Sequence, residues 1–304
     1  MISSMTQESK PVILSGFTFA RNAIKYDYLL QECLNTLLAI CDEVVIAVGE
    51  SDDETTQLVE SIRDPKLKTI ITKWDTNLGF KVLSQQTNIA MNQCLGKWGI
   101  YLQCDELIHE KYFNILKAEI EHASNDDSIE GLLFQYKHFY ASYHLLNTGR
   151  QYYRNEIRAI RLGVGIESYN DAKGFMRKGK KILVHGIPVE IYHYGHARNP
   201  LIMKTKNYDF HKLWHKENEI KKIVAAQPSP YKIENNYALA EFTGTHPAVM
   251  KMRIEQSKWS EMNFQCFQEN IKRSSGRYFL RKFLAYVETK TWRIGYNKPY
   301  RKLK

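Results

Sequence analysis

The first hundred residues predict an α/β fold with a mostly parallel sheet flanked by helices. Strand-like and helix-like patterns alternate four times over this stretch, which is typical of βαβ units. The run EVVIAV at 43–48 is β-branched and continuous, as expected for a buried parallel strand. A chain of 304 residues, 43% of them hydrophobic, is also long enough to bury a full core without disulfides or a structural metal.

Each strand of the predicted sheet is a short apolar or β-branched run. The first is VILSGF at 12–17, and the second is EVVIAV at 43–48. KTIITKW at 68–74 and WGIYLQ at 98–103 complete the set. Ligands of such sheets bind beyond the carboxyl ends of the strands, so we expect the chemistry in the segments that follow these four runs.

Helices are expected between these strands because apolar residues there recur at helical spacing. Their predicted positions are 28–40, 53–63 and 82–95. Later strands are expected at 130–139, 156–162 and 185–199, and helices with loops follow from about residue 201. We therefore predict a domain over 1–200 that contains the sheet and the site, and a helical extension over 201–304 that ends in a basic, aromatic tail.

The net charge of +10 belongs to this C-terminal tail. Residues 271–304 contain eleven Lys or Arg and a single acid, Glu288, which leaves 32 basic and 32 acidic side chains in the other 270 residues. Apolar residues recur among the cations at helical spacing, which suits an amphipathic helix on an anionic membrane surface. The alternative is a helix that packs its apolar stripe on the core and leaves its basic face in water.

Cysteine usage and the lack of targeting segments exclude several classes of protein. The five cysteines are odd in number and show no Cys-x-x-Cys spacing, which argues against a zinc ribbon or a secreted disulfide framework. The first residues lack the basic and apolar regions of a signal peptide, and no apolar stretch reaches membrane-spanning length. We therefore expect a cytoplasmic location, with peripheral contact to the inner face of the membrane if the tail binds lipid.

Polar and acidic side chains follow each of the four strands. They are Arg21 and Asn22 after the first, Glu50 and Asp53 after the second, Asn77 after the third, and Gln103, Cys104 and Asp105 after the fourth. Together they predict an acidic crevice with an arginine and amides on one side. Carboxylates in such a crevice can hold Mg²⁺ or Mn²⁺, and the metal can bridge a diphosphate. No Gly-x-Gly-x-x-Gly or Walker loop follows the first strand, so dinucleotide and P-loop sites are not expected.

These segments resemble the family 2 glycosyltransferases, whose GT-A fold has a Rossmann-like sheet, and the resemblance covers about residues 11–200. The shared motifs are Arg21-Asn22, the acidic turn Asp53-Glu54-Thr55, Asn77-Leu78-Gly79, and Asp105 in the place of an Asp-x-Asp motif. GLLFQYKHFY and IYHYGHARNP are similar to segments of an uncharacterised bacterial branch of that family. The chain departs from the pattern at Gln103, which replaces the first aspartate and is a poorer metal ligand.

The resemblance implies a role for each candidate residue. Phe17, Arg21 and Asn22 would support the nucleotide pocket, Glu50 or Asp53 would face the base or its ribose, and Gln103, Cys104 and Asp105 would approach the donor. Asp105 and His193 would hold a divalent metal, Mg or Mn. Asp171 is the first candidate for the general base that deprotonates the acceptor hydroxyl, and Glu167 is the second.

Structural roles are the alternative for several of these residues. Asp53 begins a predicted helix, where the helix dipole favours an acid. Asp105 precedes a predicted helix that it could cap, and Arg21 with Asn22 could do the same for the helix after the first strand. His193 and His196 could be hydrogen-bonded structural histidines rather than ligands.

The implied reaction is the inverting transfer of a hexose-type sugar from a nucleotide-sugar donor to a glycan or lipid-linked acceptor, in cell-envelope polysaccharide synthesis. One alternative is a non-catalytic GT-A-like binding domain, which Gln103 suggests. The other is a nucleic-acid-binding protein that acts through its basic tail. The neutral first 270 residues and the acidic crevice argue against the second alternative, so no nucleic-acid partner is expected.

Overall fold

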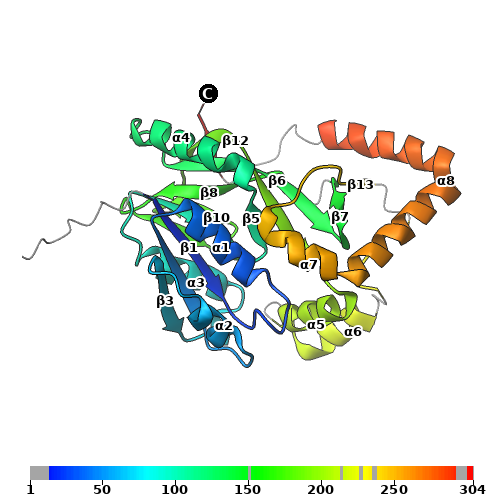
Figure 1. Cartoon of the computed structure of the whole chain (residues 1–304), viewed down its shortest axis with the longest axis horizontal. Coiled ribbons are helices and arrows are strands. Elements are labelled where there is room, and N and C mark those ends of the chain that lie inside the picture. The colour runs from blue at the N-terminus through cyan, green and yellow to red at the C-terminus, as the bar shows by residue number, and fades with distance from the viewer. Residues whose placement is uncertain are drawn as a thin grey trace, which may run out of the picture.

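The computed structural model of the chain describes residues 14–149, 152–212, 215–225, 229–234, 238–291 and 300–303 (Figure 1). Its strands are β1 (Leu14–Ala20), β2 (Glu43–Gly49), β3 (Leu67–Thr72), β4 (Trp98–Tyr101), β5 (Glu106–Ile108), β6 (Gly131–Tyr140), β7 (Ser142–Asn147), β8 (Asn155–Arg161), β9 (Ile166–Tyr169), β10 (Gly174–Arg177), β11 (Lys180–Lys181), β12 (Leu183–His196), β13 (Leu239–Glu241) and β14 (Arg301–Lys302). Its α-helices are α1 (Leu30–Ile40), α2 (Thr55–Ser61), α3 (Lys81–Met91), α4 (Phe113–Ser124), α5 (Pro200–His211), α6 (Glu217–Ala225), α7 (Lys251–Gln256) and α8 (Lys258–Thr291).

One large sheet organises the described part of the chain. Its strand order is β13-β7-β6-β8-β4-β1-β2-β3, and β12 adds to it by pairing with β6, β5 and β14. β1 lies between β2 and β4 and is parallel to both, and β2 is parallel to β3. The four strands predicted from the first hundred residues therefore form the parallel part of this sheet.

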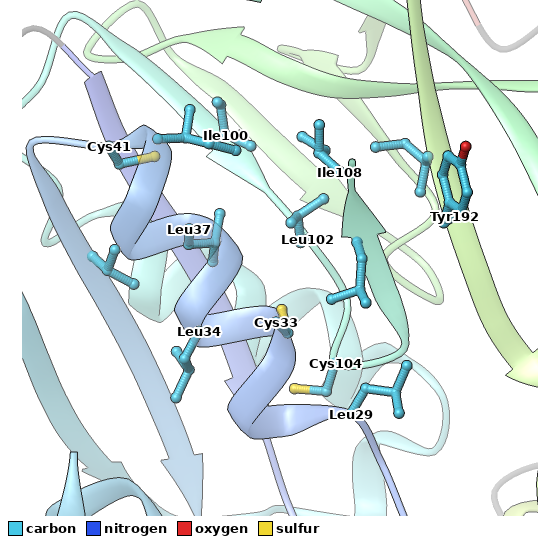
Figure 2. Close-up of a cluster of buried hydrophobic side chains, with 14 of the residues drawn as sticks. Leu29, Cys33, Leu34, Leu37, Cys41, Ile100, Leu102, Cys104, Ile108 and Tyr192 are labelled. Atoms are coloured by element: carbon cyan, nitrogen blue, oxygen red, sulfur yellow. The ribbon is translucent and has the colours of Figure 1, made fainter. Parts of the chain in front are cut away.

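The two faces of this parallel part are covered by different helices. Along β2, Val44 and Ile46 pack in the same buried cluster as α1, whereas Val45 and Ala47 pack with Ala90 of α3. This alternation follows from the period of two in a strand, and it explains why the run is apolar at every position. Figure 2 shows the α1 face, where Cys33, Leu34, Leu37 and Cys41 lie near Ile100, Leu102 and Ile108.

The expectation of a mostly parallel sheet is wrong beyond β4, because the sheet is mixed. β8 is antiparallel to β4 and to β6, and β7 is antiparallel to both β6 and β13. For β6 and β7 the physical reason is the short connection between the two strands. Only Ala141, with a positive φ of 60°, separates β6 from β7, and a parallel pair needs a crossover of a dozen residues or more.

The division of the chain at residue 200 stays a prediction, although two strands of the second part join the sheet of the first. β13 pairs with β7, and β14 pairs with β12. The second part is otherwise helical, and Figure 1 shows the long α8 at the edge of the molecule. Within the described residues, no helix is both long enough and apolar enough to cross a bilayer.

Much of the predicted tail lies outside the described residues. These comprise residues 292–299 and the side chains of the tail cations Arg277, Arg281, Lys282 and Lys290. The apolar side chains of Leu280, Phe283 and Val287, on the part of α8 that lies in the tail, are 61%, 62% and 40% exposed. All five cysteines are free thiols.

Candidate functional site

A cavity of about 490 Å³ opens beyond the carboxyl ends of β1 and β4. The end of β12 and the helix α5 form its other walls. The lining residues are Phe19, Ala20, Arg21, Ala23, Tyr26, Tyr28, Trp74, Leu83, Gln103, Cys104, Asp105, Tyr152, Tyr153, Asp171, Lys173, His193, Gly195, His196, Met203, Lys206, Asn207, Asp209 and Phe210. Six of the predicted site residues are therefore brought to one cavity: Arg21, Gln103, Cys104, Asp105, Asp171 and His193.

Asp105 is the buried carboxylate of this cavity, and an arginine, a lysine and a histidine surround it. Arg198 donates from Nη2 to Asp105 Oδ2 at 2.9 Å, and Lys206 Nζ lies 3.8 Å from the same oxygen. His193 Nε2 lies 3.9 Å from the other oxygen, Oδ1. The negative charge of Asp105 is therefore already balanced within the protein.

The neighbouring Glu106 fixes the turn that presents Asp105. Glu106 and Arg158 form a bidentate ion pair at 2.7 and 2.8 Å, and both side chains are 0% exposed. Glu106 also accepts hydrogen bonds from the Tyr136 hydroxyl and from the backbone N–H of Gln103. Because both of its carboxylate oxygens already accept hydrogen bonds, Glu106 positions the 103–106 turn and is not available to bind a ligand in the cavity.

His193 presents the lone pair of its Nε2 to the cavity. A second histidine, His138, determines which ring nitrogen of His193 carries the proton. His138 Nε2 lies 2.6 Å from the backbone carbonyl of Tyr153, which only accepts, so Nε2 of His138 carries a proton. Burial lowers the pKa of His138 to about 4, so its Nδ1 is free to accept a hydrogen bond from Nδ1 of His193 at 2.8 Å. Burial, reinforced by His138, also lowers the pKa of His193, which is therefore neutral with an unprotonated Nε2.

Gly195 allows His193 and Asp105 to approach the same point. A Cβ atom at residue 195 would lie 2.6 Å from His193 Nε2 and 3.0 Å from Asp105 Oδ2. Atoms this close would have to move, and both belong to side chains that are already held by hydrogen bonds. The glycine of the IYHYGH segment is therefore part of the site geometry.

Lys206 is a buried cation that faces the cavity from α5. Its ammonium donates to the Gly195 carbonyl at 3.4 Å and lies over the ring of Tyr28. Burial, and next the nearby Arg198, lower the pKa of Lys206 to about 7. Both effects arise because its charge is held away from water and beside another cation.

Arg21 and two aromatic rings form another wall. Arg21 donates from Nε to the Glu50 carbonyl at 2.9 Å, and its guanidinium lies 5.3 Å from the centroid of the Trp74 ring. Trp74 in turn contacts Phe19 with ring centroids 6.2 Å apart. Flat apolar surface beside a guanidinium suits the stacking of a heterocyclic base.

The predicted general base, Asp171, lines the cavity together with a cation of its own, Lys173. Lys173 Nζ lies 2.7 Å from Asp171 Oδ2, and Asp171 is 29% exposed. The nearby Glu156 is buried on β8, and burial raises its pKa to about 7. The second predicted base, Glu167, is an exposed residue of β9 and does not line the cavity.

Four other predicted site residues do not line the cavity, and their contacts are structural. Phe17 lies within β1 rather than after it, because the strand runs on to Ala20, and its buried ring stacks on Tyr101. Asn22 has a positive φ of 51° and accepts from the N–H of Asp52. Asp53 accepts from Thr55 and from the N–H of Lys25. Glu50 is exposed, and only its carbonyl faces Arg21.

The sequence prediction missed Arg198, Lys206 and His138. Arg198 lies 93 residues from Asp105 along the chain, and antiparallel pairing of β12 with β5 brings it close. One signal was present: Arg198 follows directly after the histidine-rich end of β12. Nothing in the sequence marked Lys206 among the many lysines of its segment.

The donors in the cavity do not fit a hard divalent cation. Mg²⁺ and Mn²⁺ prefer several oxygen ligands, but Gln103 replaces one carboxylate and Asp105 already pairs with Arg198. In the part of the chain that the structure describes, no three His, Cys, Asp or Glu residues form a potential metal-binding group. The metal expected at Asp105 and His193 stays a prediction that this donor set does not favour.

Comparison with known proteins gives distant matches among solved structures. No protein-family model and no curated protein matches the chain. The glycosyltransferase TarS of S. aureus matches with 18% identity and a TM-score of 0.40, over 70% of this chain and 42% of that one. A TarS 1–349 structure in complex with UDP-GlcNAc matches with 16% identity and a TM-score of 0.39, over 70% and 71% of the two chains. At these values the likeness assigns neither a substrate nor a residue role to this chain.

Proposed function

We propose that the chain is a glycosyltransferase that moves a sugar from a nucleotide-diphosphate donor to a glycan or lipid-linked acceptor. The observation that carries the proposal is one cavity at the carboxyl ends of β1 and β4, in which three kinds of group meet. A buried carboxylate, Asp105, lies beside Arg198 and Lys206. An arginine borders an aromatic wall, and a second carboxylate, Asp171, lines the same cavity. Such a concave site with a few convergent polar groups suits a small, charged donor.

Each group has a task in this reaction. The base of the nucleotide stacks near Trp74 and Arg21, and Asp105 accepts hydrogen bonds from the ribose or the sugar. The acceptor hydroxyl attacks the anomeric carbon, and Asp171 takes its proton. As the new C–O bond forms, the bond from the anomeric carbon to the diphosphate breaks and its electron pair leaves with the diphosphate. This single displacement inverts the anomeric configuration.

The finer parts of the proposal follow from the motifs of the sequence. Arg21-Asn22, the Asp53 turn and Asp105 favour a member of glycosyltransferase family 2 with a hexose-type donor, acting in cell-envelope polysaccharide synthesis. Contact of residues 271–304 with an anionic membrane surface is part of the same proposal, because a lipid-linked acceptor lies there. The exposed Leu280 and Phe283 of α8 support it.

A non-catalytic binding domain is the second candidate. Gln103 in place of an aspartate, and an Asp105 whose charge Arg198 already balances, favour it. The two candidates share the ligand and differ only in turnover. The formally neutral first 270 residues argue against nucleic-acid binding.

A thermal-shift panel tests the proposal first. UDP-, GDP-, dTDP- and CMP-sugars are each added at a hundred times the dissociation constant, where one occupied site adds roughly 2.7 kcal/mol of stability. Stabilisation by one nucleotide class, absent in Asp105→Ala, supports donor binding. Release of free nucleotide that is lost in Asp171→Asn then separates transferase from binding domain. No shift with any donor contradicts both candidates.

A further inference from the structure

The carboxylates of the cavity each have a cation of their own. Asp171 pairs with Lys173 at 2.7 Å, and Asp209 pairs with Lys212 at 2.8 Å. Asp105 pairs with Arg198 at 2.9 Å. These are the three carboxylates that line the cavity, so its negative charge is matched within the protein.

Two further cations line the cavity beyond those partners, Arg21 and Lys206. Arg21 donates to a backbone carbonyl, that of Glu50, and forms no ion pair within the described residues. The carboxylate nearest to Lys206 is Asp105, whose Oδ2 lies 3.8 Å away and already accepts from Arg198. With Lys206 protonated, the cavity therefore carries an excess of positive charge that suits an anionic ligand.

Lys206 is held in place for such a ligand. Its side chain is 13% exposed, and its ammonium lies 4.9 Å from the centroid of the Tyr28 ring. One N–H points to the Gly195 carbonyl at 3.4 Å, and an ammonium has three donors. At least one donor therefore remains for a ligand after the contacts with Gly195 and Asp105.

Arg198 does not line the cavity itself, but it holds Asp105 and packs against the ring of Tyr28. It donates to Asp105 Oδ2 and, at 2.6 Å, to the backbone carbonyl of Tyr26. Its guanidinium lies 4.1 Å from the centroid of the same Tyr28 ring that Lys206 covers. Asp105 is thus engaged by an internal cation at the position where a divalent metal would have to bind.

We infer that Lys206 binds the diphosphate of the donor in place of a divalent metal, while Arg198 holds Asp105. This inference rests on the proposed function, since it concerns the same cavity and donor. When the bond from the anomeric carbon to the diphosphate breaks, its electron pair stays on the leaving oxygen, and the ammonium neutralises the charge that develops there. The protein therefore needs no metal to bind a nucleoside diphosphate.

Titration calorimetry with UDP, GDP and dTDP tests this directly. Each ligand is measured against the unmodified full chain in EDTA and again in Mn²⁺. We expect at least one of them to bind, with dissociation constants in the two buffers that agree within about threefold. Binding that requires Mn²⁺ overturns the inference and leaves the proposed function in place. The absence of binding under both conditions overturns both together.

The variant Lys206→Met tests whether Lys206 is the residue that binds the diphosphate. Loss of a hydrogen bond to a charged group weakens nucleoside diphosphate binding by about 10- to 100-fold. Binding of the matching nucleoside, which lacks phosphate, stays within about twofold, and this shows that the variant is folded. Lys204→Met, an exposed lysine of the same helix, is the matched control and binds as the unmodified chain does. Diphosphate binding by Lys206→Met at unmodified affinity, or equal losses for nucleoside and diphosphate, overturns the assignment.

Discussion

Replacing Arg158 by methionine is expected to destabilise the protein and to release the turn that presents Asp105. The perturbed feature is the ion pair between Arg158 and Glu106, in which both side chains are fully buried. Methionine fills much of the same volume but leaves the Glu106 carboxylate without its cation. An uncompensated buried charge is the costly result, rather than the loss of attraction by itself.

The structure sets the size of the effect. Breaking a buried pair costs about 3–5 kcal/mol in general. The variant also loses the hydrogen bonds from Arg158 to the carbonyls of Ile157 and Lys173. Glu106 nevertheless keeps two donors, the Tyr136 hydroxyl and the Gln103 N–H. These remaining bonds place the expected loss near the lower end of the range, about 3 kcal/mol.

Urea unfolding followed by circular dichroism measures this loss. The double variant Arg158→Met with Glu106→Gln removes both charges and should recover at least about 1 kcal/mol relative to the single variant. Donor binding should weaken in both variants, because the 103–106 turn loses its support. A loss below about 1 kcal/mol for the single variant, or a double variant that is no more stable, would refute the reasoning.

Three further changes have defined outcomes. Between pH 4.5 and about 7 the folded state holds a proton on Glu156, whereas the unfolded chain releases it. The free energy of unfolding therefore falls as pH rises through this range, in total by on the order of 3 kcal/mol. Glu156→Gln should therefore raise the free energy of unfolding at pH 8 and leave it unchanged at pH 4. Gly195→Ala should weaken nucleotide binding about tenfold in calorimetry, because its Cβ would displace His193 or Asp105. Asp171→Asn should lower kcat at least about 100-fold and leave donor affinity unchanged.

For each of these three predictions, one outcome would contradict the reasoning behind it. A stability difference for Glu156→Gln that is equal at pH 4 and pH 8 would mean that the carboxyl does not titrate in that range. Unmodified nucleotide affinity in Gly195→Ala would mean that the ligand does not depend on His193 and Asp105. Unchanged turnover in Asp171→Asn would move the base to another residue of the cavity.

The parallel part of the sheet could be predicted from the sequence because burial on both faces leaves a simple pattern. Val44 to Val48 are apolar at every position, since alternate side chains pack against α1 and α3. The antiparallel part could not be predicted in the same way. Its register depends on contacts such as β4 with β8, which join residues far apart in the chain and leave no local periodic signal.

The site residues that follow a strand end could be predicted from the sequence. The residues that reach the site through contacts between distant elements could not. Arg21 follows β1 directly and Asp105 lies in the turn just after β4, so the strand pattern alone places them at one edge. Arg198 and Lys206 reach Asp105 only because β12 pairs with β5 and α5 follows. Asp53 was expected in the site from the acidic turn after the second strand, but its oxygens accept from the backbone N–H groups of Lys25 and Thr55.

A crystal structure with a bound nucleoside diphosphate tests the central claim most directly. The ligand is whichever of UDP, GDP and dTDP binds most tightly in calorimetry, soaked in EDTA. We expect the nucleotide in the cavity between Trp74 and α5, with its ribose near Asp105 and a phosphate oxygen within hydrogen-bond distance of Lys206 Nζ. A nucleotide bound elsewhere on the protein, with this cavity empty, would contradict it.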